Sequence, residues 1–283
     1  MRRWGSKNAS PLKYMNIGVF DSGVGGLNIL RYIIKELPEY NFIYLGDTAR
    51  APYGARSKSD ICRFTEQAVD FLFQKDCQLI VLACNTASSD ALRKIQQQYL
   101  IKKYPDRRVL GVLIPAAEEA VAKTKNRRIG VIATAAAVVS GSFEREIKKL
   151  DSKIKVFQQA CPLLAPMIEA GEEKNSMIDE ALKKYLQPLI KEKIDTLILG
   201  CTHYGIIKNK IQKIVSDKIQ VVAEGKILAQ KLKNYLKRHP EIDRLLDKEE
   251  KRIFFATDTT DQFSALGNKF FGQDIKIKKA TLE

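Results

Sequence analysis

The sequence is poor in the residues that mark metal centres and disulfide-linked scaffolds. Its 283 residues include only 5 cysteines and 2 histidines, and no two cysteines form a C-x-x-C pair. A zinc site would need ligands from distant segments, so we expect no metal. The scattered cysteines also argue against disulfides, because the cytoplasm keeps thiols reduced. Each cysteine is therefore expected to be either an inert core residue or a reactive thiol.

Long hydrophobic runs are also absent. None approaches the roughly 18 residues that cross a bilayer, so we expect no contact with a membrane. Residues 1–15 are basic and polar, without the apolar stretch of a secretory signal, and are predicted to be a disordered N-terminal extension. Met15 directly precedes the first strand-like run and is an alternative start. These features predict a cytoplasmic protein.

Negative charge is in deficit. Against 48 lysines and arginines there are 33 aspartates and glutamates, which gives a formal charge of +15 at pH 7. The lysines are spread over predicted helical faces between apolar residues, which is typical of a solvated surface, so we expect no nucleic-acid partner. A nucleic-acid-binding protein remains the alternative from another functional class. The positive field also favours an anionic substrate.

Short apolar runs alternate with helical patterns along the chain. The strand-like runs lie at 16–20, 42–45, 79–82, 109–114, 128–132, 154–157 and 196–199, and the helical patterns at 27–37, 59–75, 88–99, 142–150 and 175–191. Runs without polar alternation indicate strands that are covered on both faces, as in a parallel sheet flanked by helices. The sequence predicts a doubly wound α/β fold.

The chain contains a weak internal repeat. Residues 17–20 (IGVF) resemble 129–132 (IGVI), and 82–86 (LACNT) resemble 199–203 (LGCTH). Short apolar strands resemble one another easily, so the match is either coincidence or the trace of two similar halves. Two halves related by a pseudo-twofold axis would bring both cysteine-bearing strand ends to one cleft.

Polar residues follow the predicted strands where α/β proteins bind ligands. Cys84 and Cys201 each follow an apolar run, and each is expected to begin a helix, whose positive end favours a thiolate. Removing an α-proton and returning one to the opposite face needs a base on one side and an acid on the other, which two facing thiols supply. Cys62, Cys77 and Cys161 lack comparable polar followers and are predicted to be buried small hydrophobes.

Other strand-end residues leave alternatives open. Asp21 either caps the following helix or serves the site, by accepting a substrate ammonium group or by tuning a thiol. His203 is either a proton relay or a hydrogen-bonded structural group. The glycine turn at 23–26 does not fit a dinucleotide loop, because Asn28 occupies the third glycine position. It is predicted to be a tight turn, and we expect no cofactor.

Four motifs together resemble glutamate racemases. They lie at 17–27 (IGVFDSGVGGL), 45–54 (LGDTARAPYG), 83–88 (ACNTAS) and 199–204 (LGCTHY). The resemblance implies that Cys84 removes the α-proton of D-glutamate and that Cys201 removes that of L-glutamate. It assigns Asp21, His203 and the acidic Glu169 as catalytic assistants. The substrate-binding residues that it implies are Asp21, Ser22, Tyr53, Gly54, Asn85, Thr86, Thr134, Thr202 and His203.

The family also implies an architecture and a setting. Two α/β lobes related by a pseudo-twofold axis would enclose the site, the first from 16–113 plus 224–283 and the second from 114–223. The family works without a cofactor, supplies D-glutamate for peptidoglycan and commonly forms homodimers. Some members are reported to act on DNA gyrase as a second role.

The chain departs from the family pattern in places that bear on the substrate. Ala137 replaces a usual threonine, and the turn at 222–225 lacks its usual aspartate. Aspartate racemases, the nearest alternative, tend to have a histidine after the first cysteine motif and a glutamate after the second. Here Ser88 and His203 occupy these positions, which favours glutamate.

Overall fold

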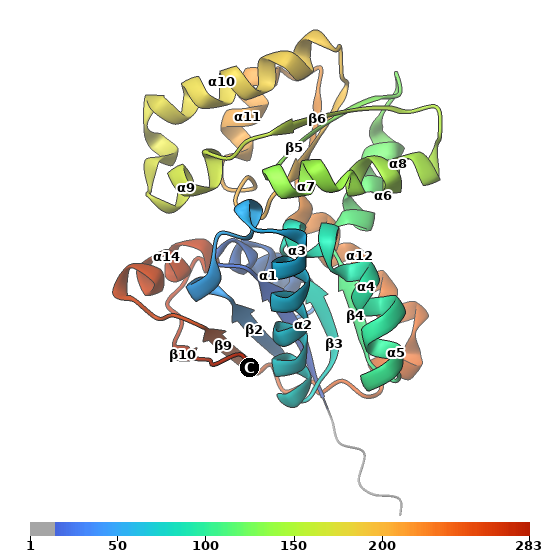
Figure 1. Ribbon diagram of the computed structural model, residues 1–283, viewed down its shortest axis with the longest axis vertical. Helices are drawn as coiled ribbons and strands as arrows, with labels where there is room; N and C mark the ends of the chain where they lie inside the picture. The colour runs from blue at the N-terminus through green and yellow to red at the C-terminus, as the bar shows by residue number, and fades with distance from the viewer. Residues whose placement is uncertain (1–14) are drawn as a thin grey trace, which may run out of the picture.

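Two parallel β-sheets, each flanked by helices, form the structure (Figure 1). This computed structural model describes residues 15–283, so the predicted N-terminal extension lies outside the described residues except for Met15. The larger sheet has six strands in the order β10-β9-β2-β1-β3-β4, and the smaller has four in the order β6-β5-β7-β8. All strand pairs are parallel. The predicted α/β fold with two parallel sheets is confirmed.

The six-stranded sheet combines the N-terminal segments with the C-terminal segment. Its strands are β1 (Asn16–Asp21), β2 (Phe42–Gly46), β3 (Cys77–Leu82), β4 (Arg108–Gly111), β9 (Arg252–Ala256) and β10 (Ile277–Lys279). Its main helices are α1 (Gly25–Glu36), α2 (Lys58–Gln74), α12 (Glu224–Arg238), α13 (Pro240–Asp243) and α14 (Asp261–Phe271). Helix α1 packs against α12 and α14. Leu27, Leu30 and Ile33 of α1 are buried, and burying such a side chain contributes about 1.5–3 kcal/mol.

The four-stranded sheet is built from the middle of the chain. Its strands are β5 (Arg128–Ala133), β6 (Lys155–Ala160), β7 (Thr196–Gly200) and β8 (Gln220–Val222). Its helices are α6 (Leu113–Lys123), α7 (Ala135–Ser140), α8 (Ser142–Leu150), α9 (Leu164–Glu169), α10 (Ser176–Lys191) and α11 (Lys208–Val215). The lobe boundaries at 113/114 and 223/224 remain a prediction.

Two predicted elements end or divide differently in the structure. The run at 109–114 is a strand only to Gly111, and Leu113 already begins α6, because Pro115 suits the first turn of a helix. The helical pattern at 88–99 is divided into α3 (Asn85–Asp90), α4 (Leu92–Lys94) and a π-helical turn (Ile95–Tyr99), which α5 (Leu100–Lys103) follows. Ser88, Ser89 and Asp90 are weak helix formers at the division.

The expectation that both cysteines begin a helix holds for one of them. Cys84 is the N-cap of α3, and its sulfur accepts a hydrogen bond from the backbone N–H of Ala87. Cys201 is instead followed by consecutive tight turns through Ile207, before α11 begins. Gly205 lies within these turns and has low helix propensity. The polar groups beside Cys201 are therefore side chains rather than the N–H groups of a helix end.

Within residues 15–283, no helix combines the length and the apolar character that crossing a bilayer requires.

Candidate active site

A cavity of about 540 Å³ lies between the two sheets, where the carboxyl ends of their strands meet. The six-stranded sheet contributes the residues after β1 and β3, and the four-stranded sheet contributes those after β5 and β7. Of the predicted site residues, all except Asp21 line it: Ser22, Tyr53, Gly54, Cys84, Asn85, Thr86, Thr134, Glu169, Cys201, Thr202 and His203. The chain thus brings two thiols from two sheets to one cavity.

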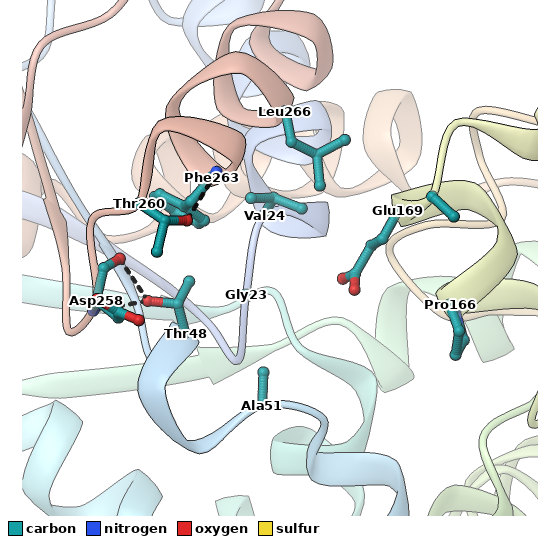
Figure 2. Close-up of a pocket in the computed structure, with 11 residues that line it drawn as sticks. Gly23, Val24, Thr48, Ala51, Pro166, Glu169, Asp258, Thr260, Phe263 and Leu266 are labelled. Atoms are coloured by element: carbon teal, nitrogen blue, oxygen red, sulfur yellow. Dashed lines mark hydrogen bonds between the residues drawn. The ribbon is translucent and has the colours of Figure 1, made fainter.

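A second hollow of about 450 Å³ adjoins this cavity (Figure 2). The two share five lining residues, among them Gly23, Ala51 and Glu169. Figure 2 shows the Glu169 carboxylate projecting from α9 toward the β1–α1 loop. The far side is closed by Phe263 and Leu266 of α14. Glu169 therefore lies where the two hollows meet.

Cys84 is surrounded by groups that favour the protonated thiol. The side chain is 5% exposed, and its sulfur lies 3.4 Å from the Ser22 hydroxyl. Burial and the nearby Asp21 carboxylate raise the pKa of the Cys84 thiol to about 12, against the lowering effect of its hydrogen bonds with Ser22 and Ala87. Cys84 is therefore a thiol at neutral pH, and it donates a hydrogen bond to the Ser22 hydroxyl.

Cys201 has a different neighbour, an imidazole. The Cys201 sulfur lies 3.7 Å from Nδ1 of His203, and Nε2 of His203 lies 2.8 Å from a Glu169 carboxylate oxygen. Burial alone would lower the pKa of His203, but the hydrogen bonds to Cys201 and Glu169 raise it to about 10. At neutral pH His203 is therefore an imidazolium that lies beside the Cys201 sulfur.

Asp21 lies directly behind the cavity wall and is 1% exposed. Its carboxylate accepts hydrogen bonds from the backbone N–H groups of Gly23 and Gly26, and from the Thr202 hydroxyl at 3.4 Å. Burial raises its pKa, and the charge of His203 works in the opposite direction. Asp21 thus holds the turn that begins α1 and also contacts the second cysteine motif. Its contacts are compatible with a capping role, and its role toward a thiol or the substrate stays a prediction.

The two sheets meet through small polar side chains and glycines. Thr86 and Thr134, which follow strands of different sheets, are hydrogen-bonded to each other at the cavity, with their hydroxyl oxygens 2.9 Å apart. A Cβ atom on Gly25 would lie 2.1 Å from the Thr202 hydroxyl oxygen, and one on Gly54 would lie 2.8 Å from the Cβ of Thr134. Glycine at both positions lets the backbone of one sheet's loops approach the other sheet.

Comparison with known proteins identifies the family. A family model described as Asp/Glu/Hydantoin racemase matches residues 27–232. The glutamate racemase of Sulfurihydrogenibium sp. is 40% identical over 269 residues, which cover 95% of this chain and 98% of that protein. The chain belongs to the glutamate racemase family.

Two crystal structures of glutamate racemases have the same architecture. An isoform from Bacillus anthracis is 34% identical, with a TM-score of 0.87 over 95% of this chain and 98% of that one. The enzyme from Francisella tularensis, crystallised in complex with D-glutamate, is 32% identical, with a TM-score of 0.86 over 96% and 99% of the two chains. The glutamate racemase fold therefore spans nearly the whole chain described here.

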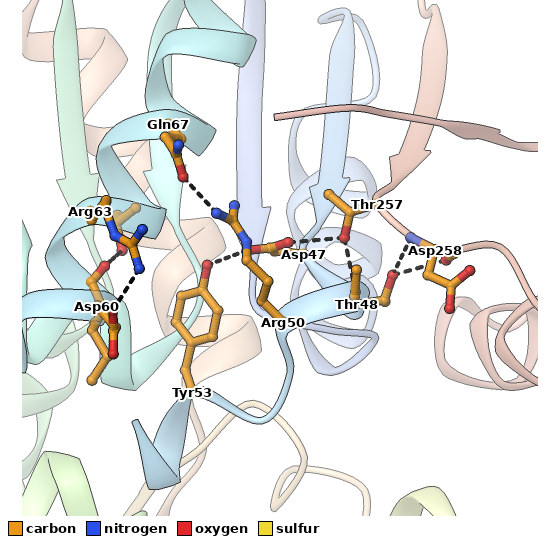
Figure 3. Close-up of polar contacts among 12 residues, drawn as sticks. Asp47, Thr48, Arg50, Tyr53, Asp60, Arg63, Gln67, Thr257 and Asp258 are labelled. Atoms are coloured by element: carbon orange, nitrogen blue, oxygen red, sulfur yellow. Dashed lines mark hydrogen bonds and ion pairs between the residues drawn. The ribbon is translucent and has the colours of Figure 1, made fainter. Parts of the chain in front are cut away.

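In this member of the glutamate racemase family, Asp47 anchors the loop that carries Tyr53 and Gly54 (Figure 3). The Asp47 carboxylate is fully buried and accepts hydrogen bonds from Arg50 Nε at 2.6 Å, the Tyr53 hydroxyl and the Thr257 hydroxyl at 2.9 Å. The backbone N–H of Asp47 donates to the carbonyl of Asp21 at 3.0 Å. Through its carboxylate and its backbone N–H, Asp47 therefore joins the loop, the C-terminal segment and the end of β1.

Replacing Asp47 with asparagine is expected to loosen this loop. The variant removes one acceptor oxygen and the charge from a buried network, so the free energy of unfolding should fall by about 1–3 kcal/mol. The KM for substrate should rise with it, because the loop lines the cavity. Urea unfolding and steady-state kinetics measure both effects. Asp60→Asn is the matched control, since Asp60 pairs with Arg63 in an exposed position in the same view. Equal stability of the two variants would contradict the anchoring role.

The structure adds detail at three kinds of predicted position. Tyr53 lines the cavity, and its hydroxyl donates a hydrogen bond to the Asp47 carboxylate. Ala137 is fully buried in the core of the four-stranded sheet and is not among the residues that line the cavity. The buried state predicted for Cys62, Cys77 and Cys161 is confirmed, although Cys161 also lines the cavity.

Among residues 15–283, no three or more His, Cys, Asp or Glu side chains are grouped to hold a metal ion.

Proposed function

We propose that this protein is a cofactor-independent glutamate racemase that interconverts L- and D-glutamate with two bases. The observation that supports this most is the pair of thiols at one cavity, one beside an imidazolium and the other held as a thiol. A racemase needs this asymmetry, because one group must accept a proton while the other donates one.

The reaction from L- to D-glutamate starts at Cys201. Its thiolate takes the α-proton, the C–H bond breaks, and the electron pair remains on the α-carbon as a carbanion stabilised by the carboxylate. The Cys84 thiol then donates its proton to the opposite face, and the new C–H bond completes inversion. Cys84 is left as the thiolate and Cys201 as the thiol, which is the state that the reverse reaction requires. His203, held by Glu169, stabilises the Cys201 thiolate.

The remaining polar groups bind the substrate. Asp21 lies behind the cavity wall, in hydrogen-bond contact with Thr202 and close enough to Cys84 to raise its pKa, and its charge would attract the α-ammonium group. Hydroxyl, amide and backbone donors of the other lining residues would bind the two substrate carboxylates, namely Ser22, Tyr53, Gly54, Asn85, Thr86, Thr134 and Thr202.

Glutamate is favoured over aspartate as the substrate. The relatives reported above are glutamate racemases, and His203 follows the second cysteine where aspartate racemases tend to have glutamate. The kcat/KM for L-glutamate, followed by optical rotation without added cofactor, is expected to exceed that for L-aspartate by at least about 100-fold. One missing methylene and the resulting misplacement of a carboxylate make a difference of this order. Comparable values for the two amino acids would contradict this specificity.

The proposed biological role of the protein is to supply D-glutamate, a building block of peptidoglycan. Two catalytic thiols require a reducing compartment, which supports a cytoplasmic location. A homodimer and an interaction with DNA gyrase remain predictions from the family.

A further inference from the structure

A buried acid that the mechanism above does not use lies against the cavity wall. Glu224 is the first residue of α12 and is 5% exposed. Its Oε2 accepts a hydrogen bond from the side-chain amide of Asn85 at 2.8 Å. Asn85 is 2% exposed, directly follows Cys84 and lines the cavity. Glu224 thus contacts a substrate-facing residue from behind.

Both side chains keep one polar atom without a partner. Within residues 15–283, neither Oε1 of Glu224 nor Oδ1 of Asn85 has a hydrogen-bond partner, although both atoms are buried. A buried carboxylate with an unpaired oxygen is costly when it is ionised. Burial raises the pKa of Glu224 to about 8, Asp21 adds to this effect, and the Asn85 hydrogen bond opposes it.

The charges on neighbouring helices do not neutralise Glu224. Helix α12 packs against α1, α6 and α13. Next to Glu224, the ring of Tyr32 in α1 covers Gly225. Charged side chains further along these elements pair with one another: Lys233 with Glu36 of α1, Lys231 with Glu118 of α6, and His239 with Glu241 of α13. The charge of Lys226, two residues beyond Glu224, also acts on Glu36. Among the described residues, the charged group that acts on Glu224 is the like-charged Asp21.

We propose that Glu224 is a positioning residue that fixes the side-chain amide of Asn85 for a substrate carboxylate. The buried, unpartnered oxygen of Glu224 makes its neutral form the one that suits substrate binding. This inference rests on the proposed function, because it assigns Asn85 to the substrate. One N–H of the Asn85 amide is held by Glu224, which orients the amide plane and leaves the second N–H for the ligand. Glutamate itself carries a net negative charge, so a second charge beside Asp21 would repel it.

The pH dependence of KM separates Glu224 from a merely structural residue. Wild-type KM is expected to rise about tenfold between pH 7 and pH 9, as Glu224 ionises. Glu224→Gln keeps an acceptor for Asn85 but cannot ionise, so its KM should stay within about twofold of wild type at pH 7 and lose the alkaline rise. Glu224→Ala loses the acceptor, so its KM should rise roughly tenfold at every pH while kcat changes little. Glu241→Gln, an exposed acid on α13, is the matched control and should behave as wild type.

The outcomes distinguish this inference from the proposed function. Wild-type protein that fails to turn over glutamate would overturn the proposed function. Turnover with an alkaline rise that persists in Glu224→Gln, or with an unchanged KM in Glu224→Ala, would overturn the role of Glu224 alone.

Protein stability provides a readout that needs no activity. The pKa of Glu224 is raised in the folded state, so its neutral form is favoured there and wild type loses stability as pH rises from about 4.5 through about 8. The melting temperature of Glu224→Gln minus that of wild type should therefore increase between pH 5 and pH 8. A difference between the two proteins that is independent of pH would overturn the neutral state of Glu224.

Discussion

Alanine at either Cys84 or Cys201 is expected to abolish racemisation in both directions, with kcat/KM falling at least about 1,000-fold. Each thiol acts as the base in one direction and as the acid in the other, and a positioned acid–base group contributes roughly 100- to 10,000-fold. Loss of one thiol therefore stops L-to-D and D-to-L conversion alike. The rate of change of optical rotation from each pure enantiomer measures this loss.

The same two variants should still catalyse a reaction that needs only one of the two bases. Elimination of halide from a β-substituted glutamate needs a single base: the α-proton leaves to the base, the halide leaves with its bonding pair, and an alkene forms. Cys84→Ala retains Cys201 and should eliminate from the L-series analogue, whereas Cys201→Ala should eliminate from the D-series analogue. Cys62→Ala is the matched control, because Cys62 lies outside the cavity beside the Asp90 carbonyl. Full racemisation by either cavity variant would contradict the two-base assignment.

Glutamine at His203 is expected to lower kcat/KM about 100-fold. His203 links Cys201 to Glu169 and is protonated at neutral pH, so its loss removes the cation that favours the Cys201 thiolate. The two enantiomers have equal free energies, so the equilibrium constant is one and kcat/KM must fall equally in both directions. Racemisation rates alone therefore do not show which thiol His203 serves.

Single-base elimination identifies the partner of His203. His203→Gln should slow elimination from the L-series analogue, which depends on Cys201, and leave the D-series reaction within a few-fold of wild type. His239→Gln is the control, since His239 pairs with Glu241 on the surface near α13. Equal slowing of the two eliminations would contradict the assignment of His203 to Cys201.

Much of the fold and the centre of the site could be predicted from local patterns. Uninterrupted apolar runs marked the buried strands β2, β3 and β7. The polar residues that follow such strands had to lie at the carboxyl edge of a sheet, which identified Cys84 and Cys201 as candidates, each at the edge of its own sheet. That the two edges would face one cavity was expected only from the internal repeat and the family resemblance.

Two residues that sequence reasoning missed, Glu224 and Asp47, act through distant contacts. Glu224 lies 139 positions from its partner Asn85, and Asp47 lies 210 positions from its partner Thr257. No periodicity or spacing marks such pairs, because the packing of α12 and the return of the C-terminal strands bring them together. The turns after Cys201 were missed for another reason. Its motif resembles that of Cys84, but the local backbone hydrogen bonds differ.

The most direct test of the two-base mechanism is to follow deuterium from D₂O into each enantiomer at low conversion of L-glutamate. Purified, chelator-treated protein is incubated with L-glutamate without added cofactor, and the α-deuterium content of the separated enantiomers is measured by mass spectrometry. Because two different thiols act on opposite faces and exchange with solvent, the D-glutamate formed should carry deuterium while the remaining L-glutamate keeps its α-proton. Equal labelling of both enantiomers, or D-glutamate that retains the original proton, would contradict the mechanism.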